Sequence, residues 1–422
     1  MHPDSNRVGG GRKVWILTFG SAEGVLLGPV QRVIRMGRMA RDAGFRPVLA
    51  FEQGLDGVLE GMEKRRLSRA LVDEIRPEDA VVASGMIDYR TLKELLDRGI
   101  GFDCDLYGLP ALEHIEIDHG DLPARKLYQS RRRLRLRLKF LLRAAERIYL
   151  SNAEQLAFLG GMLFPGSDLE STRLASRLPA KTLLLPMGMP EAAALGTGNP
   201  FPPEFQGRPV FLWGGGIWSW FDTSTLLEAF RLLADRGSPA ALYFVCGTNP
   251  SGLSTQDGPV ERTWARARDL DLLGRNVAFH DGPVDGADLP AYLEHCAAAI
   301  MSNPSHLESV CSWRTRLLDA PPYGKPVVVS GFDPLSSRMV DAGAALSSSS
   351  GDPAALAGAI DRFCSDPELR RRMGERSSAL ARELSWDAVF DPWIRRLADP
   401  HAFRGARHRL GLFEKLAFVL GA

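Results

Sequence analysis

The segment Arg208–Phe230, RPVFLWGGGIWSWFDTSTLLEAF, combines three features that together predict an α/β fold. An apolar run ends in three consecutive glycines, Gly214–Gly216, and a helical pattern begins at Thr223, directly after Asp222. Aspartate is a favourable N-cap residue, so a helix is expected to begin there. A buried strand, a glycine turn and a helix in this order are typical of the crossover unit of a parallel sheet.

The same order occurs at the start of the chain, where the run RKVWILTFG precedes a helical pattern that ends at Gly44. After Phe230, apolar runs and helical patterns alternate through PAALYFVCG, NVAFHDG, AAIMSNP and KPVVVSG. We therefore expect an α/β protein with two Rossmann-like domains that face each other across a cleft, with ligands bound at the carboxyl ends of the strands.

A stretch rich in proline and glycine separates the two series and is typical of a linker. The predicted boundaries are an N-terminal Rossmann-like domain at 1–195, a linker at 196–207 and a second Rossmann-like domain at 208–395. A basic and apolar C-terminal helix is expected at 396–422.

Composition excludes several classes of protein. The chain has 422 residues, 45% hydrophobic and 24% charged, and a net charge of +1, which gives no overall attraction to nucleic acid. Five cysteines without CxxC spacing argue against zinc and against a disulfide framework. The N-terminal MHPDSNRVGGGRK lacks an apolar signal region, and no run approaches the roughly 20 apolar residues of a membrane span. The expected location is the cytoplasm.

The glycine turn at Gly214, Gly215 and Gly216 fits a phosphate or diphosphate, because backbone N–H groups beside a helix N-terminus attract anions. A plain tight turn is the alternative. The segment has neither GxGxxG nor GxxxxGK[ST], and no acidic residue stands where it would hold an NAD ribose, so a dehydrogenase is disfavoured. Trp218 and Trp220 would either face a base or sugar ring or pack in the core.

A second group of charged residues lies in NPSHLESVCSWRTRLLDAPPYGKPVVVSG, residues 303–331. Glu308 is expected in a loop after a strand, and a helix is predicted over 314–320. Arg314 and Arg316 would then lie in its first turn, where cations oppose the helix dipole. Such a placement suggests a compensating anion such as a diphosphate, bound by guanidinium groups. A solvated surface pair is the alternative.

Taken together, these motifs resemble the GT-B glycosyltransferases of the retaining family 4 type, which show E-x7-E followed by AxAxGxPVV. The segment DAPPYGKPVVVS matches the second half, with Asp319 in place of the second glutamate and Glu308 as the first. The spacing here is E-x10-D, three residues longer. A subgroup with WGGGxxxWFDxxTLxxA and HLExxxSxRTRxLD carries the same variation. The resemblance covers most of residues 13–395.

The resemblance implies roles for individual residues. Asp319 would hold the donor ribose and Glu308 the donor sugar, while the three glycines and Arg314 with Arg316 would hold the diphosphate. The family's Arg…Lys pair after the first strand of this domain is missing, since IWSWFD occupies that region. The resemblance also implies retention of configuration without a metal or other cofactor, and no DxD-like metal signature stands out.

In the N-terminal domain, Gly20, Ser21 and Gly24 follow the first strand and are expected to face the same cleft. His119 in EIDHGD would lie near the acceptor or donor sugar, or else be an ordinary surface or core histidine. Asp105 in FDCDLYGLP is a second candidate for the cleft.

Two basic stretches suggest contact with an anionic membrane. Ten Lys and Arg lie between Arg125 and Arg147 against one acidic residue, and the C-terminal FRGARHRLGLFEKLAFVLG mixes arginine with apolar residues. Either would bring the protein to the inner membrane surface and to a lipid-linked or glycan acceptor. A solvated helix face and a packed final helix are the alternatives. Nucleic-acid binding is disfavoured, because exposed aromatics do not alternate with the charges.

The predicted function is transfer of a sugar from a nucleotide-diphosphate donor, such as a UDP-sugar, to a glycan, lipid-linked or small-molecule hydroxyl acceptor. A nucleotide-sugar 2-epimerase of the same fold is one alternative. A catalytically silent protein that binds sugar nucleotides is the other.

Overall fold

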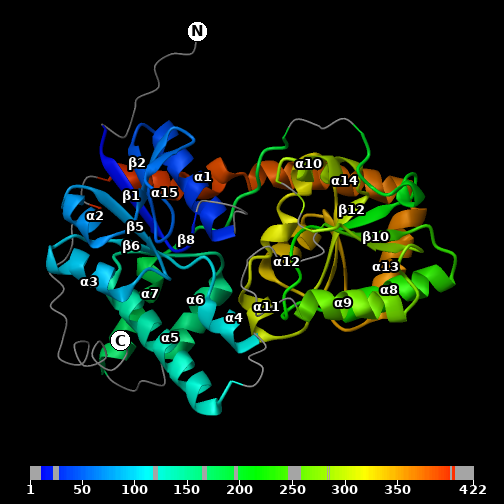
Figure 1. Ribbon diagram of the computed structural model, residues 1–422, viewed down its shortest axis with the longest axis horizontal. Coiled ribbons are helices and arrows are strands. Elements are labelled where there is room, and N and C mark those ends of the chain that lie inside the picture. The colour runs from blue at the N-terminus through cyan, green and yellow to red at the C-terminus, as the bar shows by residue number, and fades with distance from the viewer. Residues whose placement is uncertain are drawn as a thin grey trace, which may run out of the picture. The chain divides into compact units, whose positions relative to one another are not determined.

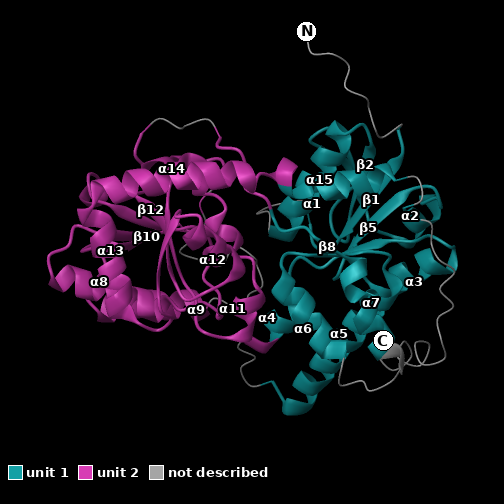
Figure 2. Cartoon of the chain, turned by 180° about the vertical axis from the view of Figure 1, so that it is seen from behind, with its two compact units in different colours: residues 1–114, 119–187, 389–422 teal, residues 115–118, 188–388 magenta. Residues whose placement is uncertain are grey.

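The computed structural model of the chain describes residues 11–21, 28–116, 122–163, 169–193, 198–245, 258–282, 284, 286–399 and 402–403. Within these residues the chain forms two compact units, each built on one sheet. Figure 2 colours them separately: one unit contains residues 1–114, 119–187 and 389–422, and the other residues 115–118 and 188–388. Residues from Val389 onward thus return to the first unit, whereas the sequence-based division assigned the chain up to 395 to the second.

The first unit has an eight-stranded sheet in the order β3-β4-β2-β1-β5-β6-β7-β8. All neighbouring strands are parallel except the β3–β4 hairpin. The central strand β1 is almost entirely buried, as expected for a strand covered on both faces. Its strands are β1 (Lys13–Thr18), β2 (Arg46–Phe51), β3 (Gly57–Leu59), β4 (Met62–Arg66), β5 (Ala80–Ser84), β6 (Asp103–Asp105), β7 (Ile148–Leu150) and β8 (Thr182–Leu184).

Helices connect these strands, and α1 joins β1 to β2 as the sequence predicted. The last helix, α15, begins in the second unit and ends in the first. The helices are α1 (Gly28–Asp42), α2 (Arg69–Glu74), α3 (Tyr89–Asp97), α4 (Pro110–Glu116), α5 (Ala124–Ala144), α6 (Ala153–Leu163), α7 (Leu169–Lys181) and α15 (Trp386–Ala398).

The second unit has a six-stranded sheet in the order β11-β10-β9-β12-β13-β14, and every neighbouring pair is parallel. In Figure 1 this sheet runs between α8 and α9 on one side and α10 and α14 on the other. Its strands are β9 (Val210–Trp213), β10 (Ala241–Phe244), β11 (Val277–Phe279), β12 (Ala298–Ser302), β13 (Val327–Ser330) and β14 (Ala345–Ser348).

The helix α8 (Thr223–Asp235) begins where the sequence predicts, because the Asp222 carboxylate accepts a hydrogen bond from the Thr225 N–H at 3.0 Å. The other helices of this unit are α9 (Gly258–Asp269), α10 (Leu289–His295), α11 (Leu307–Cys311), α12 (Pro334–Asp341), α13 (Pro353–Ser365) and α14 (Pro367–Glu383).

Part of the predicted linker packs in the second unit. Phe201 and Phe205 are buried there, at the two ends of a stretch that includes the short 3-10 turn Pro203–Phe205. Phe201 contacts the rings of Tyr243 and Tyr292 edge-on, with centroid distances of 5.2 and 5.5 Å. These apolar contacts explain why the segment is ordered despite its proline content.

Candidate functional site

The second sheet has a topological switch point between β9 and β12. From β9 the chain proceeds outward through β10 and β11, then returns to the other side of β9 for β12, β13 and β14. In open α/β sheets ligands bind at the carboxyl ends of the strands at such a point. The glycine turn follows β9 and the residues Asn303–His306 follow β12, so both flank the switch point.

At the glycine turn, the close neighbour is the side chain of Arg316. Gly215 has a φ of +127°, and a Cβ built on it would lie 2.9 Å from the Arg316 Nε. The Arg316 guanidinium lies over the ring of Phe221, 4.2 Å from its centroid, and 5.9 Å from that of Trp213. A cation is therefore held against the turn that was predicted to bind a diphosphate.

Glu308 lies in the first turn of α11, and its carboxylate is bound by Arg314. The Arg314 Nη1 donates to Oε1 at 2.9 Å and Nη2 to Oε2 at 2.7 Å, and the Ser312 hydroxyl also donates to Oε1. The side chains of Arg314 and Glu308 are 5% and 4% exposed. The helix itself is capped by His306, whose Nδ1 accepts from the Ser309 N–H.

Two sequence predictions about this segment are wrong. Residues 314–320 form no α-helix; Thr315–Leu317 and Pro321–Tyr323 are separate 3-10 turns, because the prolines at 321 and 322 lack an N–H and restrict the residue before them. The argument from a helix dipole therefore does not apply to Arg314. Its compensating anion is Glu308, which lies in a helix and not in a loop.

Asp319 lies between these two turns and is half-buried. No hydrogen bond or ion pair to its carboxylate occurs among the residues that the structure describes. Burial raises the pKa of Asp319 to about 6. A half-buried carboxylate without a protein partner is suited to accept hydrogen bonds from ligand hydroxyl groups.

Further buried polar atoms lie at the carboxyl ends of these strands. Trp213 is the last residue of β9, Ser302 the last of β12 and Ser348 the last of β14. Asn303 directly follows β12. Within the described parts of the chain, the Trp213 Nε1, the Asn303 Oδ1 and the hydroxyls of Ser302 and Ser348 have no hydrogen-bond partner. Native interiors rarely leave such atoms unpaired, so these atoms can accept or donate further hydrogen bonds.

Several of these residues were not predicted from the sequence. The ring of Phe221 contacts both arginines, with the Arg314 guanidinium at 5.1 Å and that of Arg316 at 4.2 Å from its centroid. Asp333, directly before α12, accepts from the N–H groups of Leu335 and Ser336. Sequence position could have pointed to Asp333, because polar residues that follow an apolar run mark the end of a strand in a parallel sheet.

Trp218 and Trp220 form a parallel stack in the loop between the glycine turn and α8. Their ring centroids are 5.3 Å apart and their planes differ by 2°. Both side chains are half-buried. Neither is a plain core residue, and the pair presents a partly accessible aromatic surface near the switch point.

In the first unit, Gly20 and Ser21 follow β1, next to the switch point between β1 and β5. Gly20 has a φ of +84°. Gly24 and His119 lie outside the described residues.

Asp105, predicted as a cleft residue, forms a buried ion pair. Its carboxylate accepts from the Arg32 Nε at 2.7 Å and Nη2 at 3.0 Å, and the two side chains are 8% and 0% exposed. The Arg32 guanidinium lies 4.9 Å from the ring centroids of both Tyr107 and Phe390. Asp105 thus holds α1 and the end of β6 together, and its prediction as a ligand residue is not supported by these contacts.

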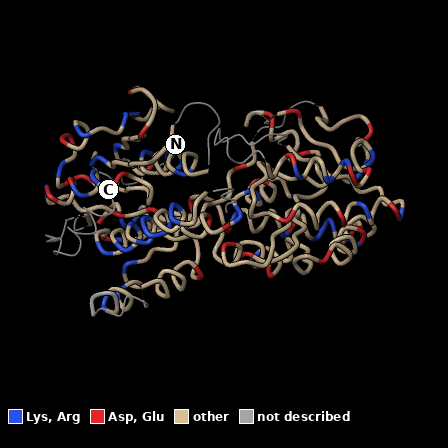
Figure 3. Tube along the Cα trace, turned by 60° about the horizontal axis from the view of Figure 1, so that its bottom comes forward, with Lys and Arg blue, Asp and Glu red and all other residues tan. Residues whose placement is uncertain are grey.

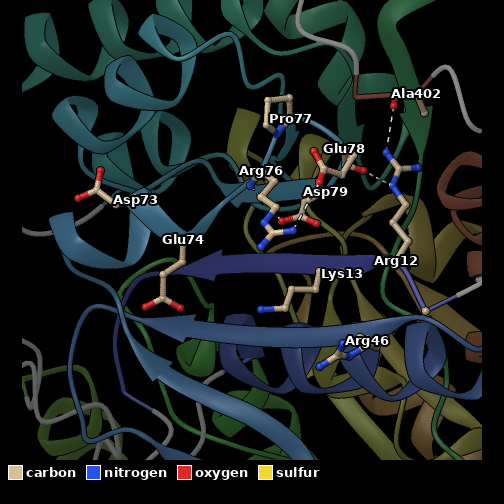
Figure 4. Close-up of a pocket in the computed structure, with 11 residues that line it drawn as sticks. Arg12, Lys13, Arg46, Asp73, Glu74, Arg76, Pro77, Glu78, Asp79 and Ala402 are labelled. Carbon is tan, nitrogen blue, oxygen red and sulfur yellow. Dashed lines mark hydrogen bonds and ion pairs between the residues drawn. The ribbon is translucent and has the colours of Figure 1, made fainter.

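A cavity of about 1090 Å³ lies at the opposite edge of the first sheet, among the residues of Figure 4. Lys13 and Arg46 begin β1 and β2, so the cavity is at the amino ends of the strands. Arg12 donates to the carbonyl oxygens of Glu78 at 2.7 Å and Ala402 at 3.2 Å. Asp79 accepts from the Trp15 Nε1. These contacts hold the fold together, and the edge is not the one where α/β sheets bind ligands.

Two whole-chain features complete the description. No group of three or more metal-ligating side chains lies close together among the described residues. Likewise, none of the helices that the structure describes combines the length and apolar character needed to cross a membrane.

Comparison with known proteins finds a family that part of the chain resembles. Residues 204–379 match the family described as "Glycosyl transferases group 1". Two curated relatives carry the name D-inositol 3-phosphate glycosyltransferase. The protein from Streptomyces griseus is 30% identical over 211 residues, which is 48% of this chain and 42% of that protein. The one from Streptomyces scabiei is 26% identical over 261 residues, 58% of this chain and 52% of that protein. The chain thus matches about half the length of each.

Solved structures resemble the chain over almost its full length. Sucrose-phosphate synthase from Thermosynechococcus elongatus matches with a TM-score of 0.64 at 16% identity, covering 92% of this chain and 99% of that one. The Anabaena protein Alr3699/HepE, in complex with UDP and glucose, matches with a TM-score of 0.64 at 14% identity and the same coverage. The trehalose 6-phosphate synthase from Burkholderia multivorans gives 0.62 at 13% identity, over 92% of this chain and 96% of that one.

These matches confirm the predicted α/β fold with two Rossmann-like domains of the GT-B type. The group 1 domain and the two named relatives support a glycosyltransferase enzyme. The matched domain begins just before β9 and contains the glycine turn, Glu308, Arg314, Arg316 and Asp319.

Proposed function

We propose that the protein transfers a sugar, with retention of configuration, from a nucleoside diphosphate donor held by the second unit to a hydroxyl acceptor. The observation that carries this proposal is the arrangement at the switch point. In a sheet with Rossmann-like strand order, a glycine turn at the end of β9 has Arg316 held against it. Asp319 follows that arginine by three residues, is half-buried, and has no partner for its carboxylate among the described residues. This combination fits a ligand that has both phosphates and hydroxyl groups.

In this proposal Arg316 and the turn Gly214–Gly216 hold the diphosphate. Asp319 accepts hydrogen bonds from the ribose hydroxyls, and Glu308 accepts one from a hydroxyl of the donor sugar. A carboxylate has about four acceptor sites, and three of those on Glu308 are used by Arg314 and Ser312. The sequence prediction placed Arg314 on the diphosphate. In this proposal Arg314 instead holds the Glu308 carboxylate in position. The Trp218–Trp220 stack is suited to a base or sugar ring.

The chemistry requires a site that stabilises a leaving diphosphate. As the bond from the sugar to the diphosphate breaks, negative charge grows on the leaving group and positive charge on the sugar ring. A fixed guanidinium and backbone N–H groups stabilise the first without reorganising during the reaction. The Glu308 carboxylate, held in place by Arg314, favours the second. No metal is required for these steps.

The acceptor would be bound by the first unit, with Gly20 and Ser21 as candidate contacts. A glycan, a lipid-linked sugar and a small polyol are all suitable hydroxyl acceptors, and the names of the two relatives make inositol 3-phosphate the first small molecule to assay. We place the enzyme in the cytoplasm, because the four described cysteines form no disulfide with one another, as is usual in a reducing compartment. A lipid-linked acceptor would bring it to the membrane surface.

Nucleotide binding tests the donor site directly. UDP, GDP, ADP and dTDP are compared by thermal shift and by calorimetry on the full chain. We expect one of them to raise the melting temperature and to bind with micromolar affinity. R316Q and D319N should each weaken that binding at least tenfold. If no nucleotide binds the wild-type protein, the donor site is wrong.

Acceptor dependence separates the two alternatives. For a transferase, donor consumption rises when inositol 3-phosphate or another true acceptor is added, and the sugar appears on the acceptor with the donor's anomeric configuration. For a 2-epimerase, product formation is independent of acceptor. A silent binding protein binds nucleotide and consumes no donor.

A further inference from the structure

Helix α5 of the first unit carries a concentration of positive charge without any acidic residue of its own. Its 21 residues include nine Lys and Arg and no Asp or Glu, whereas the whole chain has a net charge of +1. Figure 3 shows basic residues following one another along a helix of this unit. Six of these cations are exposed, and we call them the basic face: Arg125, Lys126, Arg131, Arg132, Arg133 and Arg135.

Some arginines on other helices of the protein are paired with acidic residues of their own helix, unlike those of the basic face. Arg371, for example, forms ion pairs with Glu368 and Glu375 of its own helix, and Arg231 does so with Glu228 and Asp235. Across the described structure, the six cations of the basic face form no ion pair. Their charge is therefore available to a partner outside the chain.

This arrangement costs the isolated helix stability. Arg125 and Lys126 lie in the first turn, where positive charge opposes the dipole, and the Pro123 N-cap makes no side-chain hydrogen bond. Arg131 and Arg135 are separated by one turn, a spacing at which like charges repel. An anionic surface beside the helix would relieve both effects.

Apolar groups accompany the charges. Tyr128, within the basic face, is 66% exposed, and Leu122, just before the helix, is 48% exposed. Tyrosine and leucine beside clustered cations suit the boundary between lipid headgroups and acyl chains. A nucleic acid would favour aromatic side chains alternating with the charges, and the helix has one exposed aromatic residue among six cations.

We propose that the basic face of α5 docks the protein on a membrane surface rich in anionic phospholipids, with Tyr128 and Leu122 entering the headgroup region. The surface belongs to the first unit and is independent of the donor site, so its test does not depend on the proposed function.

The test is co-sedimentation of the full chain with vesicles of phosphatidylcholine alone or with about 30% phosphatidylglycerol. We expect binding to the mixed vesicles at low salt and at least tenfold weaker binding to neutral vesicles. Raising the salt toward 1 M should abolish binding, since charges are then screened over about 3 Å. The variant R131Q/R132Q/R133Q/R135Q should bind about 1000-fold more weakly, because each of the four cations contributes roughly one kcal/mol near an anionic surface.

The matched control is R268Q/R371Q/R372Q/R395Q, which removes four exposed charges that are ion-paired elsewhere. It should bind vesicles like the wild type. Equal binding of wild type to both vesicle types, or equal loss in both variants, overturns the proposal. So does tight binding of an RNA or DNA oligonucleotide through the same arginines without vesicle binding.

A measurement on the unmodified protein keeps the proposal testable if the quadruple variant does not fold. Hydrogen exchange of the wild type with and without mixed vesicles should show protection over residues 122–136. Protection confined to other segments, including the C-terminal basic stretch, assigns membrane contact elsewhere and contradicts the role of α5.

Discussion

The Nε of Arg316 lies 2.9 Å from the position that a Cβ on Gly215 would occupy. The glycine is therefore required for two reasons, its φ of +127° and the arginine packed against it. The same contact fixes the arginine beside the turn that follows β9. One close approach thus links the two parts of the proposed diphosphate site, which are about 100 residues apart in the chain.

Substituting Gly215 should disturb the turn and the site together. G215A is expected to cost about 1–3 kcal/mol of unfolding free energy from backbone strain and to weaken nucleotide binding by displacing Arg316. G214A is the control, since a Cβ there would make an ordinary contact of 3.7 Å with the Arg316 carbonyl oxygen. Urea unfolding and calorimetry measure both effects. Equal behaviour of the two variants would contradict the close approach.

The buried pair of Glu308 and Arg314 predicts a strong coupling between the two residues. R314Q leaves a buried carboxylate without its cation and should cost about 3–5 kcal/mol. The double variant E308Q/R314Q should cost less than the sum of the single ones, since both charges are then removed. Denaturant titrations of the four proteins measure the coupling free energy.

Kinetics distinguish the two roles considered for Arg314. If it acts by holding Glu308, R314Q lowers kcat and leaves nucleotide affinity unchanged, while R314K, which keeps the charge, recovers part of kcat. In the E308Q background the substitution should have little further effect on kcat. A loss of nucleotide affinity equal to that of R316Q would instead assign Arg314 to the diphosphate.

Asp319 predicts a pH dependence of both stability and binding. Burial raises its folded pKa to about 6, above the unfolded value of about 3.9. Between these values the unfolded chain releases a proton that the folded protein retains, so the contribution of Asp319 to stability falls as pH rises from about 4 to 6. At pH 7.5 D319N should therefore be more stable than wild type by about 1–2 kcal/mol, at the lower end because the side chain is only half-buried. At pH 4 this difference should disappear.

The affinity for nucleotide should rise with pH, whereas the contribution of Asp319 to stability falls. An ionised Asp319 accepts hydrogen bonds from ribose hydroxyls better than the protonated acid does, so affinity should fall as pH drops below about 6. D319N should bind weakly at every pH. Wild-type affinity that is constant from pH 5 to 7.5, or a D319N variant with normal affinity, would argue against the assignment.

The return of α15 to the first unit predicts a large effect of one arginine and a small effect of its neighbour. Arg396 donates to both oxygens of Asp103 at 3.0 Å and to Glu146 at 3.0 Å, and Asp103 is fully buried. R396M should cost about 3–5 kcal/mol, because it leaves a buried charge unpaired. R395M should cost no more than about 0.5 kcal/mol, since Arg395 is 72% exposed and, among the described residues, pairs with Asp391 alone. Chemical unfolding of the two variants checks the difference.

Local order along the chain was predictable because local chemistry determines it. The strand β9, the glycine turn, the Asp222 cap and helix α8 lie where the sequence predicts, since each depends on neighbours within a few residues. The helix predicted over 314–320 is wrong, because prolines downstream of a helical pattern can replace the helix by 3-10 turns. Both α/β units followed from the alternation of strands and helices.

The partners of charged residues were not predictable in the same way. Asp105 pairs with Arg32 and Asp103 with Arg396, across 73 and 293 positions of sequence. Nothing local distinguishes such a carboxylate from one that binds a ligand. Arg314 illustrates the same limit at short range, since a turn in the backbone directs it to Glu308, six positions earlier.

Composition, spacing and turn chemistry in the sequence alone determined the α/β class, the two units and the glycine turn, because these depend on periodicity and on backbone freedom. Tertiary structure decided which charges are already neutralised. Burial makes an unpaired charge costly, so the fold pairs Asp105 with Arg32 and Arg314 with Glu308. The fold leaves the Asp319 carboxylate without a described partner and holds Arg316 against Gly215. Only three-dimensional packing distinguishes these two charged residues from those that are paired inside the protein.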